Sequence, residues 1–178
     1  YLLRQSDTMT LVMMTGQKDN SYVDHIYNLI PELKTTKPGE LQSKKFPMLK
    51  NVVFLDDEEM PGMFHWDQLY DFAKDITDEQ LQAAKNDVTC HDVVNMQYTS
   101  GTTGFPKGVM LTHHNLLNNG KAIGDCMKFT EQDRLLIHVP LFHCFGAVLG
   151  YMASITHYTT VVLNDHFNPV QALEIIEA

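Results

Sequence analysis

The stretch "VVNMQYTSGTTGFPKGVMLTHHN", residues 93–115, contains the sequence features that decide the fold of this chain. Apolar and polar side chains alternate from Val94 to Tyr98, which is the period of a β-strand. A segment rich in Gly, Ser and Thr follows, and the apolar run from Val109 to Leu111 predicts a second strand. Thr112 is a suitable N-cap for the helix that comes next. The stretch therefore predicts strand, loop, strand and helix in succession.

The same alternation continues on both sides of this stretch. Further strands are predicted at residues 8–14, 52–55, 134–139 and 159–163. Helices are predicted at residues 22–30, 66–73, 144–153 and from Asn168 onward, with Thr77 and Gln80 as a capping-box pair for another. Strands that alternate with helices imply a layered α/β fold, with a largely parallel sheet flanked by helices. The apolar helix at 144–153 is expected to be buried in the core.

The composition indicates a globular protein whose main partner is not nucleic acid. The chain has 178 residues, and 44% of them are hydrophobic, which is enough for a sizeable core. Its 22 acidic and 13 basic residues give a net charge of −9, whereas contact with a nucleic-acid backbone requires a basic face. The acidic run from Asp56 to Glu59 is interpreted as a solvated loop.

Cysteine usage and hydropathy indicate the cellular compartment. The three cysteines, Cys90, Cys126 and Cys144, are widely spaced, which favours neither a disulfide framework nor a zinc site. We therefore expect a reducing, cytoplasmic location. The longest mostly apolar run, residues 139–155, is interrupted by His143 and is too short for an ordinary membrane-spanning helix. No transmembrane segment is predicted.

The two ends of the chain indicate a piece of a longer protein. The chain opens on Tyr1 without an initiator methionine, and it closes on Ala178 within a helical pattern that has just begun. Two portions are expected within it. They are residues 1–90 and residues 91–178, and the second contains the loop rich in Gly and Thr.

The loop after Tyr98 has the composition of an anion-binding site. Its glycines and hydroxyl residues are Thr99, Ser100, Gly101, Thr102, Thr103, Gly104 and Gly108. The glycines let the backbone approach a ligand, while hydroxyl and backbone N–H groups donate hydrogen bonds to an anion with many oxygens. Lys107 adds a positive charge, and Pro106 stiffens the turn before it. Because ordering costs about 1–2 kcal/mol of backbone entropy per residue, we expect the loop to be mobile until a ligand orders it.

Two other interpretations of this loop are open. A surface turn rich in Gly and Thr explains an isolated "GTTG", although it explains the whole segment less well. A Walker-type NTPase or kinase is the weaker interpretation, because the spacing G-x-x-x-x-G-K-[ST] is absent and Lys107 is followed by Gly108.

The segment "YTSGTTGFPKG", residues 98–108, resembles the signature phosphate loop of the adenylate-forming superfamily. This superfamily contains acyl-CoA synthetases, aryl-CoA ligases, luciferases and peptide-synthetase adenylation domains. A second segment, "PLFHCFG", residues 140–146, resembles the family segment in which a histidine borders the carboxylate and adenylate pocket. The likeness continues through "THHNLLNN" and "ITHYTTVVL" and is greatest to the fatty acyl-CoA synthetases. The sequence departs from the family at Tyr158, where such sequences usually carry a glycine before the strand.

The resemblance implies a fold and an activity. The chain would form part of the large N-terminal, AMP-binding domain, with the C-terminal domain absent. The enzyme would use ATP to activate a carboxylic acid, expected to be a fatty acid, as an acyl-adenylate and would then transfer the acyl group to coenzyme A. ATP, Mg²⁺ and coenzyme A are therefore implied, with small molecules as the partners. The alternatives are another adenylate-forming enzyme or a non-catalytic nucleotide-binding homologue, and the chain length of the acid and the oligomeric state stay open.

The resemblance also implies roles for individual residues. The β- and γ-phosphates of ATP would be bound by Thr99, Ser100, Gly101, Thr102, Thr103, Gly104 and Lys107. His143 would position the α-phosphate or the acyl carboxylate, with Phe142 and Phe145 as an apolar wall; without the resemblance, His143 would be interpreted as a hydrogen-bonded core histidine. The catalytic lysine, the ribose-binding aspartate and the acidic residue for magnesium would lie after Ala178. No metal ligand is therefore predicted in this chain, and the fragment alone is expected to be inactive.

Overall fold

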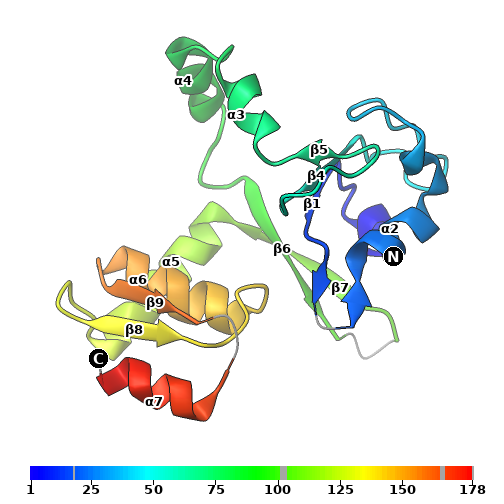
Figure 1. Cartoon of the computed structure of the whole chain (residues 1–178). Coiled ribbons are helices and arrows are strands. Elements are labelled where there is room, and N and C mark those ends of the chain that lie inside the picture. The colour runs from blue at the N-terminus through cyan, green and yellow to red at the C-terminus, as the bar shows by residue number, and fades with distance from the viewer. Residues whose placement is uncertain (18, 101–103, 165–166, 178) are drawn as a thin grey trace. The chain divides into compact units, whose positions relative to one another are not determined.

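The computed structural model describes residues 1–17, 19–100, 104–164 and 167–177 (Figure 1). The chain divides into two compact units, Tyr1–Asn86 and Asp87–Ala178, which are described separately below as unit 1 and unit 2. No helix among the described residues is both long and apolar enough to cross a membrane.

Unit 1 is built around a small parallel sheet. Its strands are β1 (Thr10–Met13), β4 (Asn51–Phe54) and β5 (Phe64–His65), in the order β1-β4-β5. Both neighbouring pairs are parallel, and Thr10 lies opposite Asn51 in the register. The strands predicted at 8–14 and 52–55 are thus confirmed, and the central strand is the most buried because it has neighbours on both sides.

The remaining elements of unit 1 are short. They are α1 (Leu2–Gln5), β2 (Gly16–Gln17), β3 (Asn20–Ser21), α2 (Tyr22–Leu29), the 3₁₀-helix η1 (Pro31–Lys34), α3 (Gln68–Ala73) and α4 (Asp78–Asn86). The hydroxyl of Ser21 caps α2 by accepting a hydrogen bond from the N–H of Asp24 over 3.0 Å. The predicted capping box before α4 is present, because the N–H of Thr77 donates to Gln80 and the N–H of Gln80 donates to Thr77.

The core of unit 1 lies between α2 and the sheet. Its fully buried side chains include Ile30, Leu33, Leu49, Val52 and Phe54. These residues come from the end of α2, from η1, from the loop before β4 and from β4 itself. Burial of large aliphatic and aromatic side chains contributes about 1.5–3 kcal/mol each, so this cluster provides the main stabilisation of unit 1.

Asp56 connects the ends of β1 and β4. Its Oδ2 accepts hydrogen bonds from both the N–H and the hydroxyl of Thr15, each over 2.6 Å. Both hydrogen bonds from Thr15 lower the pKa of Asp56 below its ordinary value of 3.8, and the one from the hydroxyl has the larger effect. The acidic run is therefore not simply solvated, because its first carboxylate joins two neighbouring strand ends.

Unit 2 begins with a β-hairpin. Strand β6 (Val93–Thr99) pairs antiparallel with β7 (Lys107–Thr112), and Val93 lies opposite Thr112. The predicted alternation of strands is confirmed, but this pair differs from the largely parallel arrangement expected for the chain. The connection between the two strands is short, and strands joined in this way pair antiparallel.

The second strand pair of unit 2 is parallel. Strand β8 (Arg134–Ile137) pairs with β9 (Thr160–Leu163), and Arg134 lies opposite Thr160. Together with the sheet of unit 1, this pair confirms the predicted α/β class, a mixture of parallel strands and helices. The connection from β8 to β9 contains helices, as expected for a parallel crossover.

The helices of unit 2 are α5 (His113–Met127), the π-helix η2 (Phe145–Met152), α6 (Ala153–Thr156) and α7 (Pro169–Glu177). Thr112 caps α5 as predicted, in a capping box with Asn115. The side chain of Asn168 likewise caps α7 by accepting from the N–H of Val170 over 3.0 Å. The helix predicted at 144–153 is present, but it is only partly buried, because the buried residues of η2 are Gly146, Val148 and Gly150.

Helix α5 packs closely against the end of η2 and against α6 through two glycines (Figure 1). A Cβ atom added to Gly120 would lie 2.7 Å from the Cβ of Met152, and one added to Gly124 would overlap the imidazole of His157. The Nε2–H of His157 donates to Oδ1 of Asp125 over 3.0 Å, across the same contact. Hydrogen bonds from Lys121 and then from His157 lower the pKa of Asp125.

Tyr158 adopts a left-handed backbone conformation, with φ of 57°. It follows α6 in a Schellman motif, because the N–H of Thr159 donates to the C=O of Ser154 over 3.0 Å and the N–H of Tyr158 donates to Ile155 over 3.3 Å. This position of the motif favours glycine. The departure from the family pattern at Tyr158 therefore places a bulky residue where the backbone still takes the shape typical of glycine.

Candidate active site

Two of the candidate phosphate-binding residues, Thr99 and Lys107, lie at the ends of strands β6 and β7 that the connection joins (Figure 1). Thr99 is the last residue of β6 and lies directly opposite Lys107, the first residue of β7. Directly opposed residues of an antiparallel pair project from the same face. The register therefore places the hydroxyl of Thr99 and the ammonium of Lys107 on one face of the hairpin, where both residues are exposed.

The loop between the strands is shorter than the predicted one, because Thr99 and Lys107 belong to the strands. Ser100 and Gly104 are exposed residues of the connection, while Gly101, Thr102 and Thr103 lie outside the described residues. Gly104 has φ of 92°, and a Cβ atom added there would meet nothing within 4 Å. The backbone conformation, rather than lack of space, therefore requires glycine at this position.

The second predicted segment connects β8 to η2. The backbone of His143 is fixed at both polar groups: its N–H donates to the C=O of Pro140 over 3.1 Å, and its C=O accepts from the N–H of Ala147 over 3.0 Å. The Nδ1 atom of its imidazole accepts a hydrogen bond from the N–H of Phe145 over 3.2 Å. The side chain is exposed, so His143 is not a core histidine.

The two predicted wall residues have different surroundings. Phe145 lines an apolar pocket of about 300 Å³ next to β8. The other residues around this pocket are Met127, Leu135, Leu136, Ile137, His138, Val139, Leu149 and Gly150. Phe142 is 84% exposed and projects into solvent. Of these two residues, Phe145 alone is among those that line the pocket, and the role of both as a wall stays a prediction.

The segment that contains His143 leaves the carboxyl edge of the β8–β9 pair. Ligands of α/β folds bind beyond the carboxyl ends of parallel strands. At this edge the ring of His138 lies 5.0 Å from the ring of Phe167, a contact that sequence reasoning missed. The two residues come from different strand ends, and the order of strands in the sheet cannot be seen in a local pattern.

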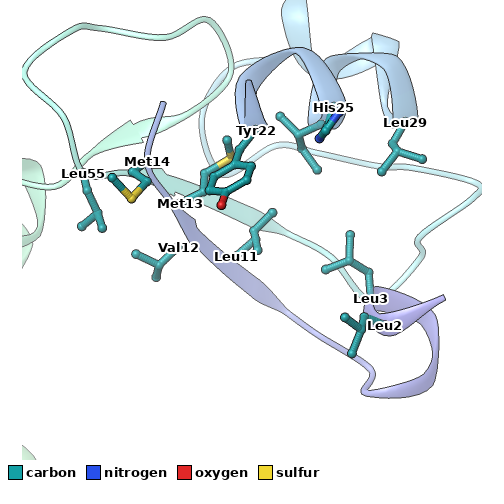
Figure 2. A pocket seen from close by; sticks show the side chains of 11 residues that line it. Leu2, Leu3, Leu11, Val12, Met13, Met14, Tyr22, His25, Leu29 and Leu55 are labelled. Carbon is teal, nitrogen blue, oxygen red and sulfur yellow. The ribbon is translucent and has the colours of Figure 1, made fainter. Parts of the chain in front are cut away.

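Unit 1 contains a larger pocket that sequence reasoning also missed. It has a volume of about 640 Å³ and is lined almost entirely by apolar side chains of α1, β1 and α2 (Figure 2). Leu2, Leu11, Val12 and Leu29 are among them. The sequence feature that could have indicated this pocket is the apolar character of both faces of β1. Val12, for example, is an apolar residue of this strand that is 48% exposed. None of the predicted site residues lines this pocket.

A metal site does not emerge from the residues that the structure describes. Among them, no group of three or more His, Cys, Asp or Glu side chains is placed to hold a metal ion.

The AMP-binding enzyme family profile matches residues 1–178, the entire chain. The chain belongs to this family. The membership agrees with the resemblance of the segments at 98–108 and 140–146 to the adenylate-forming superfamily.

Curated relatives of this AMP-binding family member include acyl-CoA ligases. The chain is 46% identical over 177 residues to YngI of Bacillus subtilis (strain 168), a provisionally named acyl-CoA synthetase. The match covers 99% of this chain and 32% of YngI. It is 37% identical over 182 residues to the mitochondrial medium-chain acyl-CoA ligase ACSF2 of Mus musculus, covering 99% of this chain and 29% of that protein. The chain therefore spans about a third of the length of these relatives.

A solved structure is similar to the structure of this chain. It is that of a protein from Rhodopseudomonas palustris CGA009 that is provisionally named a long-chain-fatty-acid CoA ligase. The TM-score is 0.69 at 23% sequence identity, and the match covers 99% of this chain and 37% of that one. The likeness shows that the α/β arrangement of this chain is that of a part of such ligases.

Proposed function

We propose that this protein is an ATP-dependent acyl-CoA synthetase. The observation that carries the proposal is the register of the β6–β7 hairpin, in which Thr99 lies directly opposite Lys107. Both residues belong to the segment that resembles the family phosphate loop. The relatives named above as acyl-CoA synthetase and ligase support the same activity. The proposed substrates are ATP, a fatty acid and coenzyme A, in a reducing compartment such as the cytoplasm.

The main physical difficulty of this reaction is the repulsion between two anions. Two unit charges 4 Å apart repel by about 4 kcal/mol at an effective dielectric of 20, so a carboxylate approaches ATP only after the triphosphate is partly neutralised. Lys107 supplies a positive charge, and Thr99 and Ser100 supply hydroxyl donors. Thr99 and Lys107 project from strand ends whose backbone is paired before ATP binds, and preorganised donors lower the barrier most effectively.

The proposed first step joins the acid to AMP. A carboxylate oxygen attacks the α-phosphorus of ATP, the bond from that phosphorus to the bridging oxygen breaks, and pyrophosphate leaves. In the second step the sulfur of coenzyme A attacks the acyl carbon, the thiol proton is released, and AMP leaves. In the first step Lys107 and the loop would hold the β- and γ-phosphates while His143 and Phe145 would border the acyl group. Mg²⁺ would accompany the triphosphate, and its protein ligand is not among the residues proposed here.

Exchange of labelled pyrophosphate into ATP tests the first step. The full-length protein is assayed with acetate, octanoate, palmitate and benzoate, and release of AMP is then measured with and without coenzyme A. We expect exchange with a fatty acid and release of AMP that depends on coenzyme A. Exchange without that dependence would indicate another adenylate-forming enzyme, and nucleotide binding without exchange would indicate a non-catalytic homologue.

A further inference from the structure

Gly108 leaves a gap between the side chains on one face of the β6–β7 hairpin. It is half-buried and lies directly opposite Tyr98, in the pair next to that of Thr99 and Lys107. Successive residues of a strand project to opposite faces, so Tyr98 and Gly108 belong to the face opposite that of the two candidate phosphate-binding residues. A glycine in a strand has no side chain to pack and weakens the pairing around it. The gap therefore lies behind the backbone from which Lys107 projects.

Two side chains of β6 fill this gap. A Cβ atom added to Gly108 would lie 3.0 Å from Sδ of Met96 and 3.3 Å from Cε1 of Tyr98. The hydroxyl of Tyr98 also donates to Sδ of Met96 over 3.2 Å, and a thioether packs favourably against an aromatic ring. Both side chains are half-buried. An aromatic side chain across from a strand glycine restores the packing that the glycine lacks, so these contacts hold β7 against β6.

We propose that Tyr98, which packs over Gly108 together with Met96, is a positioning residue for Lys107. The inference rests on the proposed function, in which Lys107 binds the β- and γ-phosphates of ATP. The ring of Tyr98 belongs to the opposite face, so it acts through the backbone of β7 rather than by contact with the nucleotide. It keeps β7 from moving away from β6 one residue from the ammonium group. Because a misplacement of about 1 Å can cost about a hundredfold in rate, small movements of this strand end matter.

Three variants of the full-length protein test the contribution of the ring. Tyr98→Ala removes the ring and Tyr98→Phe removes only its hydroxyl, while Met110→Ala removes an exposed side chain of β7 that lies opposite Met96. We expect kcat/KM for ATP in pyrophosphate exchange to fall by about ten- to hundredfold in Tyr98→Ala. The Michaelis constant for ATP should rise, and that for the acid should stay unchanged. The other two variants should stay within about threefold of the wild type, because a hydrogen bond to a thioether and an exposed side chain contribute little.

A double variant with Lys107→Ala separates positioning from stability. If Tyr98 acts through Lys107, Tyr98→Ala has a much smaller effect on kcat/KM once Lys107 has been replaced. A purely structural role would lower the folded fraction, which reduces kcat by the same factor in both backgrounds and leaves both Michaelis constants unchanged. That result would overturn the inference. Equal losses in Tyr98→Phe and Tyr98→Ala would overturn it as well, because they would assign the effect to the hydroxyl instead of the ring.

Deuterium uptake by the backbone measures the strand pairing without substrate. Peptides that cover residues 93–99 and 107–112 of the full-length protein are followed by mass spectrometry. We expect faster uptake in Tyr98→Ala and in Met96→Ala, and wild-type uptake in Tyr98→Phe and Met110→Ala. Wild-type uptake in all four variants would overturn the inference. Should Tyr98→Ala fail to fold, Met96→Ala removes one of the two contacts over Gly108 and carries the same expectation.

The two measurements also distinguish this inference from the proposed function. If the wild-type protein shows no pyrophosphate exchange, the proposed function fails, while deuterium uptake still decides whether Tyr98 holds the pairing of β6 with β7. Pyrophosphate exchange by the wild type, together with unchanged kinetics and uptake in Tyr98→Ala, overturns the role of Tyr98 alone.

Discussion

Lys107 has its position set by a strand rather than by a flexible loop. Its pairing opposite Thr99 fixes the backbone from which the ammonium projects, and the exposed side chain is available to an anion. A charge on a fixed backbone loses less entropy on binding than one on a mobile segment. The contribution of Lys107 should therefore be larger than that of an ordinary surface lysine.

The substitution Lys107→Ala tests the contribution of Lys107 to the proposed reaction. We expect kcat/KM for ATP in pyrophosphate exchange to fall by up to about a hundred- to a thousandfold, which is the loss associated with one preorganised donor. The control is Lys85→Ala, which removes an exposed lysine from the last turn of α4 and should leave exchange unchanged. Equal effects of the two substitutions would contradict the assignment of Lys107.

Tyr158→Gly should stabilise unit 2. A left-handed non-glycine residue costs about 1–2 kcal/mol, while glycine adds about 0.5–1 kcal/mol of unfolded-state entropy, so the net gain should be about 0.5–1 kcal/mol. The side chain is 83% exposed, so its removal loses little packing. Urea unfolding measures the gain. Tyr158→Ala keeps the Cβ atom and should show no gain, and a similar gain in both variants would locate the effect in the ring instead of the backbone.

At the scale of the elements, the packing of α5 against η2 and α6 depends on the absence of side chains at two positions of α5. Gly124→Ala introduces a methyl group into the space of the His157 ring, which must move away from Asp125. Overpacking of this kind costs about 1–3 kcal/mol. We expect a loss of that size in the free energy of unfolding.

Two further variants isolate the cause of this loss. Asn119→Ala adds no clash on an exposed position of the same helix and should have little effect. His157→Ala removes the imidazole that the added methyl group would meet. In that background Gly124→Ala should therefore lower the free energy of unfolding by less than it does in the wild type. Additive losses would show that the imidazole is not what the methyl group meets.

The link between Asp56 and Thr15 predicts a dependence of stability on pH. The pKa of Asp56 is lowered in the folded state, so the unfolded state binds more protons as the pH falls. The stabilisation is complete above the unfolded value of 3.8 and is lost as the pH falls through the lowered pKa. Asp56→Asn should therefore reduce stability at neutral pH and reduce the acid dependence of urea unfolding. Asp57→Asn, on the neighbouring residue of the acidic run, should have the wild-type profile.

The types of element were largely predictable from the sequence, and their partners were not. Alternation identified residues 94–98 as a strand, but a local pattern carries no information on whether the partner runs parallel. The antiparallel pairing with β7 was therefore not predicted. The motif located Thr99, Lys107 and His143 as site candidates. It could not reveal that His157 contacts Asp125, because these residues are 32 positions apart in the chain.

At the scale of the whole molecule, the chain spans 32% of YngI and 29% of mouse ACSF2. Adenylation requires the triphosphate, the adenosine and the carboxylate to be held at the same time, because the rate advantage comes from fixing all of the reacting groups together. In the proposed function, Thr99, Lys107 and His143 would supply only some of these contacts.

The 178-residue chain alone should accordingly fail to catalyse exchange of pyrophosphate into ATP. The measurement compares the purified chain with the full-length protein, using Mg²⁺ and the same series of acids. Circular dichroism of the isolated chain shows whether it is folded, so that a lack of activity can be separated from a lack of structure. Robust exchange by the chain alone would mean that its residues form a complete active site.

The parallel sheet of unit 1 also determines the order in which the chain folds. Thr10 and Asn51 pair across 41 residues, whereas Thr99 and Lys107 are joined by a short connection. Hairpins form within about 1–10 μs, while contacts between distant residues must first overcome the entropy of closing a long loop. During synthesis, β1 stays without its partner until Phe54 has left the ribosome. In that interval its apolar side chains and unpaired backbone are open to other chains, so unit 1 is most prone to aggregate before β4 has been made.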